Sequence, residues 1–539
     1  MKYKNKLTAF VWLCLLFTMV CCTDWDAHYD AESQRVWSDK TLWEEIASRP
    51  QLGEFAELLE QYGYKEILNG SQMYTVFAPI GVIDTEGLST EKIRKEVIEN
   101  HIARFAHSAN NTTNTTNTLK GGGVVMLNSK SVLFSRNGDS YTFGNNKLTD
   151  EHNIIAKNGV LHVIEGQQTF FHNIWEYLTT DSRFDSICNY LYSFNEEYLD
   201  EEASVKGEIN AEGKQEYLDS VIISYNSLLY SLGQLNNEDS TYTMIIPTND
   251  AWKDAYERIE PYFKYPAKNV KNADSLQMYY TKLSVVRDLV FSHTVQGSMS
   301  DSLISTARGV FHKPFETLLS DFSGWDQAVK CSNGQVFVVD ELKHEPWESW
   351  HEIIKVEAER QDVLAEDLDC GTSKETNEKL RLVYRRKLAS SDSLFAKVSG
   401  GAYLEVLETK QDQHPYVAFN VRNTLRGKYE LKVVFLPQNL ASKTILPNIF
   451  DAKCYVANDN GVRLSAVTSK RLVNDPTRID TVEIGTLDFA SCFYAQEMAG
   501  LQLELKSTPE QHEVDGRYEY EPYSGTFLID CIILEPVKE

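Results

Sequence analysis

The chain has 539 residues, too many for one hydrophobic core, because single cores stop growing near roughly 250–300 residues. Hydrophobic residues make up 42% and charged residues 24%, which is typical of a globular chain and excludes a disordered or fibrous one. The formal net charge of −25 argues against nucleic acid and anionic lipid surfaces as partners, since binding to phosphates depends on Lys and Arg. We therefore expect an acidic protein of several globular domains.

Residues 1–21 predict a secretory leader. Lysines near the start precede an uncharged and mostly apolar run of 14 residues, Leu7–Val20. That length fits the core of a signal peptide and falls short of the roughly 20 residues that span a bilayer as a helix. Polar residues follow directly at 23–26, which counts against a short transmembrane anchor. We therefore expect an exported protein.

Two adjacent cysteines, Cys21 and Cys22, end this leader and resemble the lipobox of bacterial lipoproteins. The resemblance implies that one of the two thiols is diacylglycerated; the preceding residues favour Cys22, and Cys21 stays open. Two acyl chains give stable anchoring, whereas one chain gives only marginal membrane binding. The acidic segment 23–26 resembles the surface-export signal of Bacteroidetes-type lipoproteins. This implies a protein on the outer face of the outer membrane, with residues 22–37 as the anchor linker.

Residues 38–170 contain two motifs at a characteristic separation. Thr75–Pro79 reads Thr-Val-Phe-Ala-Pro and predicts a buried strand that proline ends, and Asn158–Glu165 reads Asn-Gly-Val-Leu-His-Val-Ile-Glu and predicts another. Apolar residues at helical spacing predict amphipathic helices within residues 40–68 and around 90–105. The motifs and their order resemble the fasciclin (FAS1) domain. The resemblance implies an α+β fold and adhesion rather than turnover.

The same order returns in residues 171–343, where Tyr242–Trp252 and Asn333–Asp340 match the two motifs. An insertion near 195–220 makes this copy divergent, and the resemblance implies a second fasciclin-like domain. Phe77 and Ile245 end matching strands, so both are predicted in the core. His101 and His293 are predicted at corresponding places. We assign both to the fold, because no nucleophile motif accompanies either.

The rest of the chain predicts a connector and a sandwich. Residues 344–391 are highly charged and predict a helical connector. Residues 392–539 contain short alternating strands between turns, a pattern that predicts an all-β sandwich. Gly427–Val433 and Gly525–Pro536 resemble the galactose-binding-like sandwich of many carbohydrate-binding modules. The expected fold class is therefore α+β tandem fasciclin-like domains followed by an all-β sandwich.

We expect no catalytic residue, metal site or cofactor. The cysteines after Cys22 are scattered without a Cys-x-x-Cys pair. His344 and His351 lie seven residues apart, about two helical turns or roughly 10 Å, too far for one ion. Trp347 and Trp350 fit either packing or a sugar platform, and packing is favoured because aromatic residues dominate cores. No nucleophile elbow, Walker loop or dinucleotide fingerprint occurs in the sequence.

Tyr518, Tyr520 and Tyr523 are the candidate ligand-binding residues, in a presumed loop before the last strand. Tyrosine rings there could stack on a sugar face while nearby carboxylates accept hydroxyl protons. Ordinary edge-strand tyrosines are the competing interpretation. The leading hypothesis is a non-catalytic surface lipoprotein that binds glycan or protein, accessory to a SusC/SusD-type uptake system. The alternatives are a stand-alone adhesin for matrix or neighbouring cells, and a hydrolase with its site in the sandwich.

Overall fold

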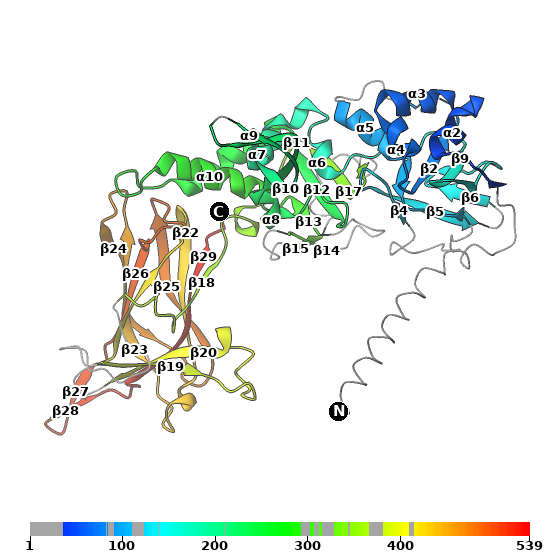
Figure 1. The fold of residues 1–539 in the computed structure, drawn as a ribbon. Coiled ribbons are helices and arrows are strands. Elements are labelled where there is room, and N and C mark those ends of the chain that lie inside the picture. Colours follow the sequence, from blue (N-terminus) through cyan, green and yellow to red (C-terminus); the bar gives the residue numbers. More distant parts are fainter. Residues whose placement is uncertain are drawn as a thin grey trace, which may run out of the picture. The chain divides into compact units, whose positions relative to one another are not determined.

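The chain forms two compact units, drawn in Figure 1. The first runs to Thr180 and includes residues 236–240 and 330–334, and the second holds 181–235, 241–329 and 335–539. Three short segments of the second sequence repeat, 171–180, 236–240 and 330–334, thus belong to the first unit. The computed structural model describes residues 36–81, 83–84, 91–109, 123–137, 140–210, 212–292, 302–306, 312–314, 328–342, 345–365, 381–408 and 414–538.

The first unit is built on a five-stranded sheet with the order β1-β8-β9-β2-β3. Both predicted motif strands, β2 and β9, are buried along their whole length and pair in parallel. Helices α2 to α4 pack on this sheet over one apolar core, and a second core under the sheet β4-β5-β6-β7 includes Phe77. The elements are β1 Val36–Trp37, α2 Leu42–Ala47, α3 Gly53–Gln61, α4 Tyr64–Asn69, β2 Tyr74–Pro79, α5 Glu91–Glu99, β3 Ile102–Arg104, β4 Gly123–Val125, β5 Ser131–Asn137, β6 Ser140–Phe143, β7 Asn146–Lys147, β8 Ile154–Ala156, β9 Gly159–Ile164 and α6 Ile174–Tyr177.

The second repeat has a sheet of the order β16-β17-β12-β13, which matches β8-β9-β2-β3 strand for strand. The register matches too, because Thr75 pairs with Ala103 as Thr243 pairs with Phe291. The elements are α7 Asp185–Tyr192, β10 Asn195–Ile209, β11 Gln215–Asn226, α8 Ser227–Leu232, β12 Tyr242–Pro247, α9 Asn249–Ile259, α10 Ala273–Val286, β13 Val290–Phe291, β14 Ser302–Ile304, β15 His312–Pro314, β16 Val329–Cys331 and β17 Gly334–Val339.

This register corrects one prediction about the histidines. The backbone N–H of Phe77 donates to the carbonyl oxygen of His101 at 2.8 Å, and that of Ile245 donates to the carbonyl oxygen of Leu289 at 2.9 Å. Leu289, not His293, therefore occupies the place of His101. Both positions are buried, one with a polar ring and the other with an aliphatic side chain. His293 itself lies outside the described residues.

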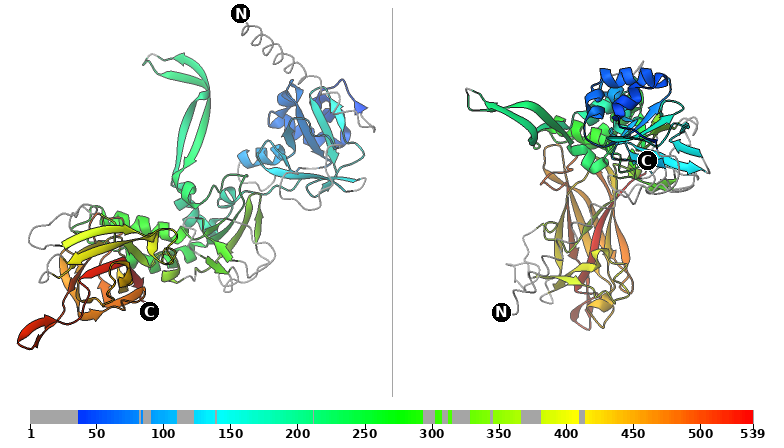
Figure 2. Two further views of the ribbon diagram at one scale, coloured as in Figure 1. Left: turned by 90° about the horizontal axis from the view of Figure 1, so that it is seen from below. Right: turned by 45° about the vertical axis from the view of Figure 1, so that its right-hand side comes forward.

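The insertion in the second repeat is the antiparallel hairpin of β10 and β11. Figure 2 shows it projecting from the other elements of its repeat. Its pairing shifts register three times between Asp200 and Ile209. Tyr198, Tyr225 and Ile209 are exposed, so this hairpin buries little apolar surface of its own.

The C-terminal part of the second unit is a β-sandwich. One sheet has the order β19-β20-β29-β22-β25 with β18 also paired to β29, and the other has the order β21-β26-β23-β24. Apolar side chains from both sheets form one core, in which Tyr429, Phe435 and Phe450 are fully buried. The strands are β18 Ile354–Glu357, β19 Arg381–Lys387, β20 Ala402–Glu408, β21 Tyr416–Val421, β22 Gly427–Phe435, β23 Ile449–Ala457, β24 Arg463–Val473, β25 Asp480–Phe489, β26 Leu501–Ser507, β27 Gln511–Val514, β28 Arg517–Tyr520 and β29 Thr526–Pro536.

The helical connector predicted for residues 344–391 is wrong in the part of this segment that the structure describes. Its described parts, 345–365 and 381–391, contain a short 3-10 turn at Pro346–Glu348 and the strands β18 and β19. Strand β18 alternates apolar and charged residues, as a half-buried strand does, whereas β19 holds the run Leu-Val-Tyr between basic residues. Arg386 of β19 forms an ion pair with Glu405 at 2.6 Å, so a charge assigned to a helix face lies on an edge strand. The sandwich therefore begins at residue 354.

Candidate functional site

The loop predicted for the three tyrosines is wrong in part: Tyr518 and Tyr520 lie on strand β28 of a hairpin with β27, and Tyr523 follows that strand. Two residues with positive φ, Asp515 at 52° and Gly516 at 76°, form its turn. Tyr518 and Tyr520 are two positions apart on β28, so their side chains leave the same face of the ribbon. Tyr518 is 72% exposed, whereas Tyr520 and Tyr523 are half-buried. Figure 1 shows the hairpin at the end of the sandwich away from α10.

The structure brings Tyr520 and Tyr523 together and adds a residue that the sequence did not point to, His414. The ring of His414 lies 5.0 Å from Tyr520 and 5.6 Å from Tyr523, and the two tyrosine rings lie 5.9 Å apart. The hydroxyl of Tyr523 is 3.4 Å from Nδ1 of His414. We call these three side chains the aromatic cluster. His414 is 109 residues away in sequence from Tyr523, so no local pattern could have revealed it.

An arginine on β24 holds the base of this hairpin. Arg471 donates two hydrogen bonds to Glu521, at 2.9 and 2.7 Å, and forms an ion pair with Glu510 at 3.1 Å. The hydrogen bonds from Arg471 lower the pKa of Glu521. Glu521 is thus engaged in structure, while the acidic side chains of Asp515 and Glu519 are exposed on the hairpin and accessible to a ligand.

Three carboxylates gather beside the central strand β29. Burial, with Glu357 and Glu359 nearby, raises the pKa of Asp530 to about 7. Ser399 N donates to Asp530 at 3.0 Å, and its hydroxyl donates to Glu357. Carboxylate oxygens suit hard cations. Within the described ranges, however, no group of three or more His, Cys, Asp or Glu side chains is placed to hold a metal ion. Asp530 is only 3% exposed, so we regard it as structural.

The interior histidines of the first repeat also belong to the fold. Both rings are fully buried, and burial lowers the pKa of His101 to about 4 and that of His162 to about 3. Nδ1 of His101 donates to Val97 O at 3.0 Å, and its Nε2 accepts from Gln168 N at 2.9 Å. Both nitrogens of each ring have backbone partners, since those of His162 contact His107 and Asn153. The structural role predicted for His101 is confirmed.

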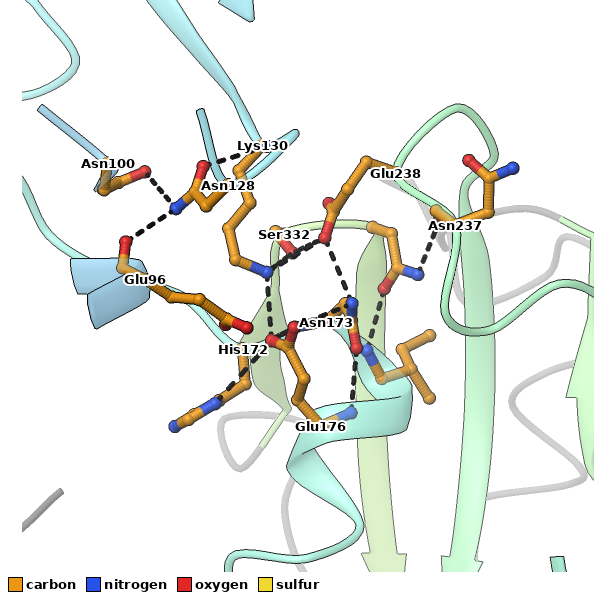
Figure 3. Close-up of polar contacts among 12 residues, drawn as sticks. Glu96, Asn100, Asn128, Lys130, His172, Asn173, Glu176, Asn237, Glu238 and Ser332 are labelled. Carbon is orange, nitrogen blue, oxygen red and sulfur yellow. Dashed lines mark hydrogen bonds and ion pairs between the residues drawn. The ribbon is translucent and has the colours of Figure 1, made fainter. Parts of the chain in front are cut away.

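A buried lysine joins distant segments of the first unit (Figure 3). Lys130 is 4% exposed, and its Nζ donates to Glu176 at 3.0 Å, to Glu238 at 2.9 Å and to Ser332 at 3.2 Å. An ammonium group has three donors, so these contacts use all of them. The Phe170 ring covers the same group at 5.2 Å. This arrangement stabilises the fold and leaves no donor for a ligand.

A cleft of about 800 Å³ in the second unit is lined mostly by residues that the sequence did not single out. Its lining comes from 258–264, 345–351, 426–428 and 488–490, with single residues from elsewhere. Lining residues spread over so much of the chain form no motif. Trp347 lies on this lining, whereas Trp350 is 3% exposed and packs against Tyr262, as the packing interpretation predicted.

The N-terminal predictions concern residues that the structure does not describe. The leader and Cys22 lie outside the described ranges. In the part of the chain that is described, no helix has the length and apolar character needed to cross a bilayer.

Comparison with solved structures found similarities at low identity. A FAS1 domain pair from the insect cell adhesion molecule Fasciclin I is 14% identical, covering 57% of this chain and 97% of that one, with a TM-score of 0.20. A CBM22-1 xylan-binding domain from Paenibacillus barcinonensis is 12% identical, with coverages of 35% and 97% and a TM-score of 0.19. A Podospora anserina GH26-CBM35 mannanase is 13% identical with a TM-score of 0.18, and the match spans 35% of this chain and 28% of that enzyme. We draw no conclusion about ligands from similarities this low.

Comparison with sequences locates one family in the chain. A search of curated proteins found no match. The family model described as Fasciclin domain matches residues 50–166, which hold both predicted motifs of the first repeat and the strands β2 to β9. Residues 50–166 of this chain are a fasciclin domain.

Proposed function

We propose that this chain is a non-catalytic surface protein that captures glycan through its C-terminal sandwich. Acylation at Cys22 would anchor it in the outer membrane, where it would serve a SusC/SusD-type uptake system. In this proposal the second repeat is also a fasciclin domain, and the pair acts as a spacer and protein-contact surface. The observation that carries the proposal is the aromatic cluster of His414, Tyr520 and Tyr523 next to the exposed Tyr518.

The cluster has the features of a sugar-binding surface. Its rings pack edge to face at 5.0 to 5.9 Å, an arrangement that holds each ring in place before a ligand arrives. Tyr518 projects from the same face of the hairpin as Tyr520 and adds a second, freely accessible ring. Exposed carboxylates at Asp515 and Glu519 supply acceptors for sugar hydroxyls.

The test is a glycan array with the mature full chain, followed by titration of the strongest glycan. We expect the double variant Tyr520→Ala, Tyr523→Ala to bind at least roughly tenfold more weakly, and Tyr518→Ala to bind several-fold more weakly. Tyr230→Ala is the matched control, because Tyr230 is 82% exposed on α8 and lies outside the sandwich. Unchanged affinity in the double variant would refute the aromatic cluster as the site.

Other outcomes of the array would change the function. Binding to no glycan, with binding to a transporter protein instead, would move the function from sugar capture to assembly. Binding to matrix protein or neighbouring cells would favour a stand-alone adhesin. Release of new reducing ends from a bound glycan would make the chain a hydrolase.

The anchor is tested separately. The double variant Cys21→Ala, Cys22→Ala should leave the membrane fraction, and the parent should incorporate labelled palmitate, because stable anchoring depends on the acylated cysteine. A double variant that still fractionates with the outer membrane, together with an unlabelled parent, would show that the anchor is wrong.

A further inference from the structure

The cleft lies at the end of the sandwich opposite the aromatic cluster. Strand β29 begins at Thr526, three residues after Tyr523 of the aromatic cluster. It ends at Pro536, directly before the cleft residue Val537. Its 11 residues span roughly 35 Å at about 3.3 Å per residue. The cleft is therefore a second place, independent of the proposed glycan site. Its volume of about 800 Å³ falls within the roughly 300–1,000 Å³ of small-molecule sites.

Backbone hydrogen bonds hold the walls of this cleft together. Arg426 N donates to Tyr262 O at 3.0 Å, and Cys492 N donates to Lys264 O at 2.7 Å, so strand ends of the sandwich are fixed to the turn after α9. Gly427 has φ of +140°, and a Cβ there would meet Cε1 of His351 at 3.1 Å. Glycine thus lets the His351 ring lie close against β22. The cleft is formed by the fold before any ligand binds.

The charges of the lining favour an anion. Four cationic side chains line it against three carboxylates, in a chain whose net charge is −25: Arg258, Lys264, Arg426 and Lys428 against Glu345, Asp459 and Asp488. Lys264 and Arg426 are exposed. Within the described residues neither has a carboxylate within the 4.0 Å of an ion pair. An ammonium and a guanidinium that line one cleft, without carboxylate partners of their own, can hold a carboxylate or sulfate.

The remaining lining favours a ring that carries hydroxyl groups. Trp347 and Tyr262 supply aromatic surface. His351 is 4% exposed, lies 4.9 Å from the Tyr262 ring and 4.7 Å from the Tyr429 ring, and lines the cleft. Its buried Nε2 has no hydrogen-bond partner among the described residues. Burial lowers the pKa of His351 to about 4, so the ring is neutral at pH 7 and offers one donor or acceptor at Nε2.

We propose that this cleft binds an acidic sugar, a saccharide unit that carries a carboxylate or a sulfate. Lys264 and Arg426 contact the anionic group, Trp347 lies against the face of the sugar ring, and Nε2 of His351 bonds to a hydroxyl. The charges alone would accept any small anion. The aromatic wall and the buried imidazole restrict the ligand to an anion on a hydroxylated ring.

Calorimetry with the mature full chain tests this, using four probes: an oligogalacturonate, a chondroitin sulfate oligosaccharide, a neutral galactan oligosaccharide of the same length, and sodium sulfate. We expect at least one acidic oligosaccharide to bind roughly tenfold or more tightly than the neutral one, and to weaken with added salt. The two acidic arms distinguish the carboxylate from the sulfate source. Lys264→Ala with Arg426→Ala should weaken this binding roughly tenfold or more.

The controls separate this result from unfolding and from the proposed glycan site. Lys253→Ala with Arg478→Ala removes two cations that do not line the cleft, with side chains 71% and 70% exposed, and should bind as the parent does. Both acidic oligosaccharides binding no better than the neutral one, or unchanged binding by the Lys264 and Arg426 variant, would overturn the inference. Equal binding of sodium sulfate would reduce the cleft to a general anion site. Loss of acidic-sugar binding only in the Tyr520 and Tyr523 variant would contradict this inference and would still support the proposed function.

Discussion

The two repeats share a backbone frame but differ in what they bury. In both, an Asn-Gly pair begins the central strand: Asn158 with Gly159, and Asn333 with Gly334. Gly159 has φ of +154° and Gly334 of +148°, and a Cβ on Gly159 would lie 1.9 Å from Tyr74 O. Three positions after these glycines the first repeat has His162 and the second has Phe337, both buried. The backbone motif therefore sets the sheet, while the interior can be polar or apolar.

The largest expected effect tests whether both central strands lie in cores. Phe77 is fully buried and stacks on Phe143 at 3.7 Å, and Ile245 is 1% exposed. Phe77→Ala should lower the free energy of unfolding by about 3–5 kcal/mol and Ile245→Ala by about 2–5 kcal/mol, through lost burial and a cavity. Urea unfolding measures the loss, and hydrogen exchange localises it to β2 or β12. Phe105→Ala is the control, since Phe105 is 73% exposed. An unchanged midpoint for Phe77→Ala would contradict the matched cores.

The next effect compares the two asparagines. Asn158 accepts from Leu42 N at 2.8 Å and donates to Leu68 O at 2.7 Å and Gly70 O at 2.8 Å. Asn333 accepts from Ile174 N at 2.9 Å and donates to Asn237 O at 3.0 Å.

Because truncation leaves these buried backbone groups unpaired, Asn158→Ala should cost about 2–4 kcal/mol and Asn333→Ala about 1–3 kcal/mol. The shift in urea midpoint at constant m-value measures both. If neither variant shifts the midpoint, the asparagines do not hold the helices to the sheet.

Lowering the pH should destabilise the first repeat more than the second, because the first repeat buries two neutral histidines. His101 and His162 have lowered pKa values, about 4 and about 3, whereas their unfolded pKa is near 6.5. As the pH falls below 6.5 the unfolded chain binds protons first, so stability present above that pH is lost toward pH 4.

We expect a loss of about 2 kcal/mol per histidine between pH 7 and 5. The position that corresponds to His101 holds Leu289, so His101→Leu should reduce this dependence. Urea unfolding at both pH values compares parent and variant. An identical pH slope in the two proteins would count against the neutral buried rings.

The smallest effect concerns the first helix of each repeat. Thr41 caps α2 and Asn173 caps α6, each in a reciprocal box with Glu44 or Glu176. Thr41→Ala should cost about 1 kcal/mol. Asn173→Ala should cost slightly more, because Asn173 also donates to Glu238 at 3.2 Å. Thermal unfolding measures both, with Lys40→Ala as the control. A Thr41→Ala protein as stable as its control would show that the box adds nothing.

The sequence predicted the elements whose pattern is local. The central strands β2, β9, β12 and β17 followed from apolar runs bounded by Pro or Asn-Gly. Strand β24 carries no such local signal, because none of its 11 residues is buried. Four of the seven residues of β19 are Arg or Lys, and these charges misled the connector prediction.

The sites were predictable only in part. Tyr520 and Tyr523 are close in sequence and meet in space, whereas His414 joins them through the fold of the sandwich. The cleft residues Lys264, His351 and Arg426 come from segments that only tertiary structure brings together. Hydrophobic periodicity predicts the helix or strand in which a residue lies, and it gives no information about contacts between residues far apart in the sequence.

The buried Lys130 has a consequence for the order of folding during synthesis. Of its three acceptors, Glu238 follows it by 108 residues and Ser332 by 202. A chain that emerges from its N-terminus first exposes Lys130 long before those partners exist, and until then Glu176 alone neutralises it. The first unit therefore reaches its final packing only after most of the second repeat has emerged. A nascent chain stopped at residue 180 should hold a fasciclin domain that is still incomplete.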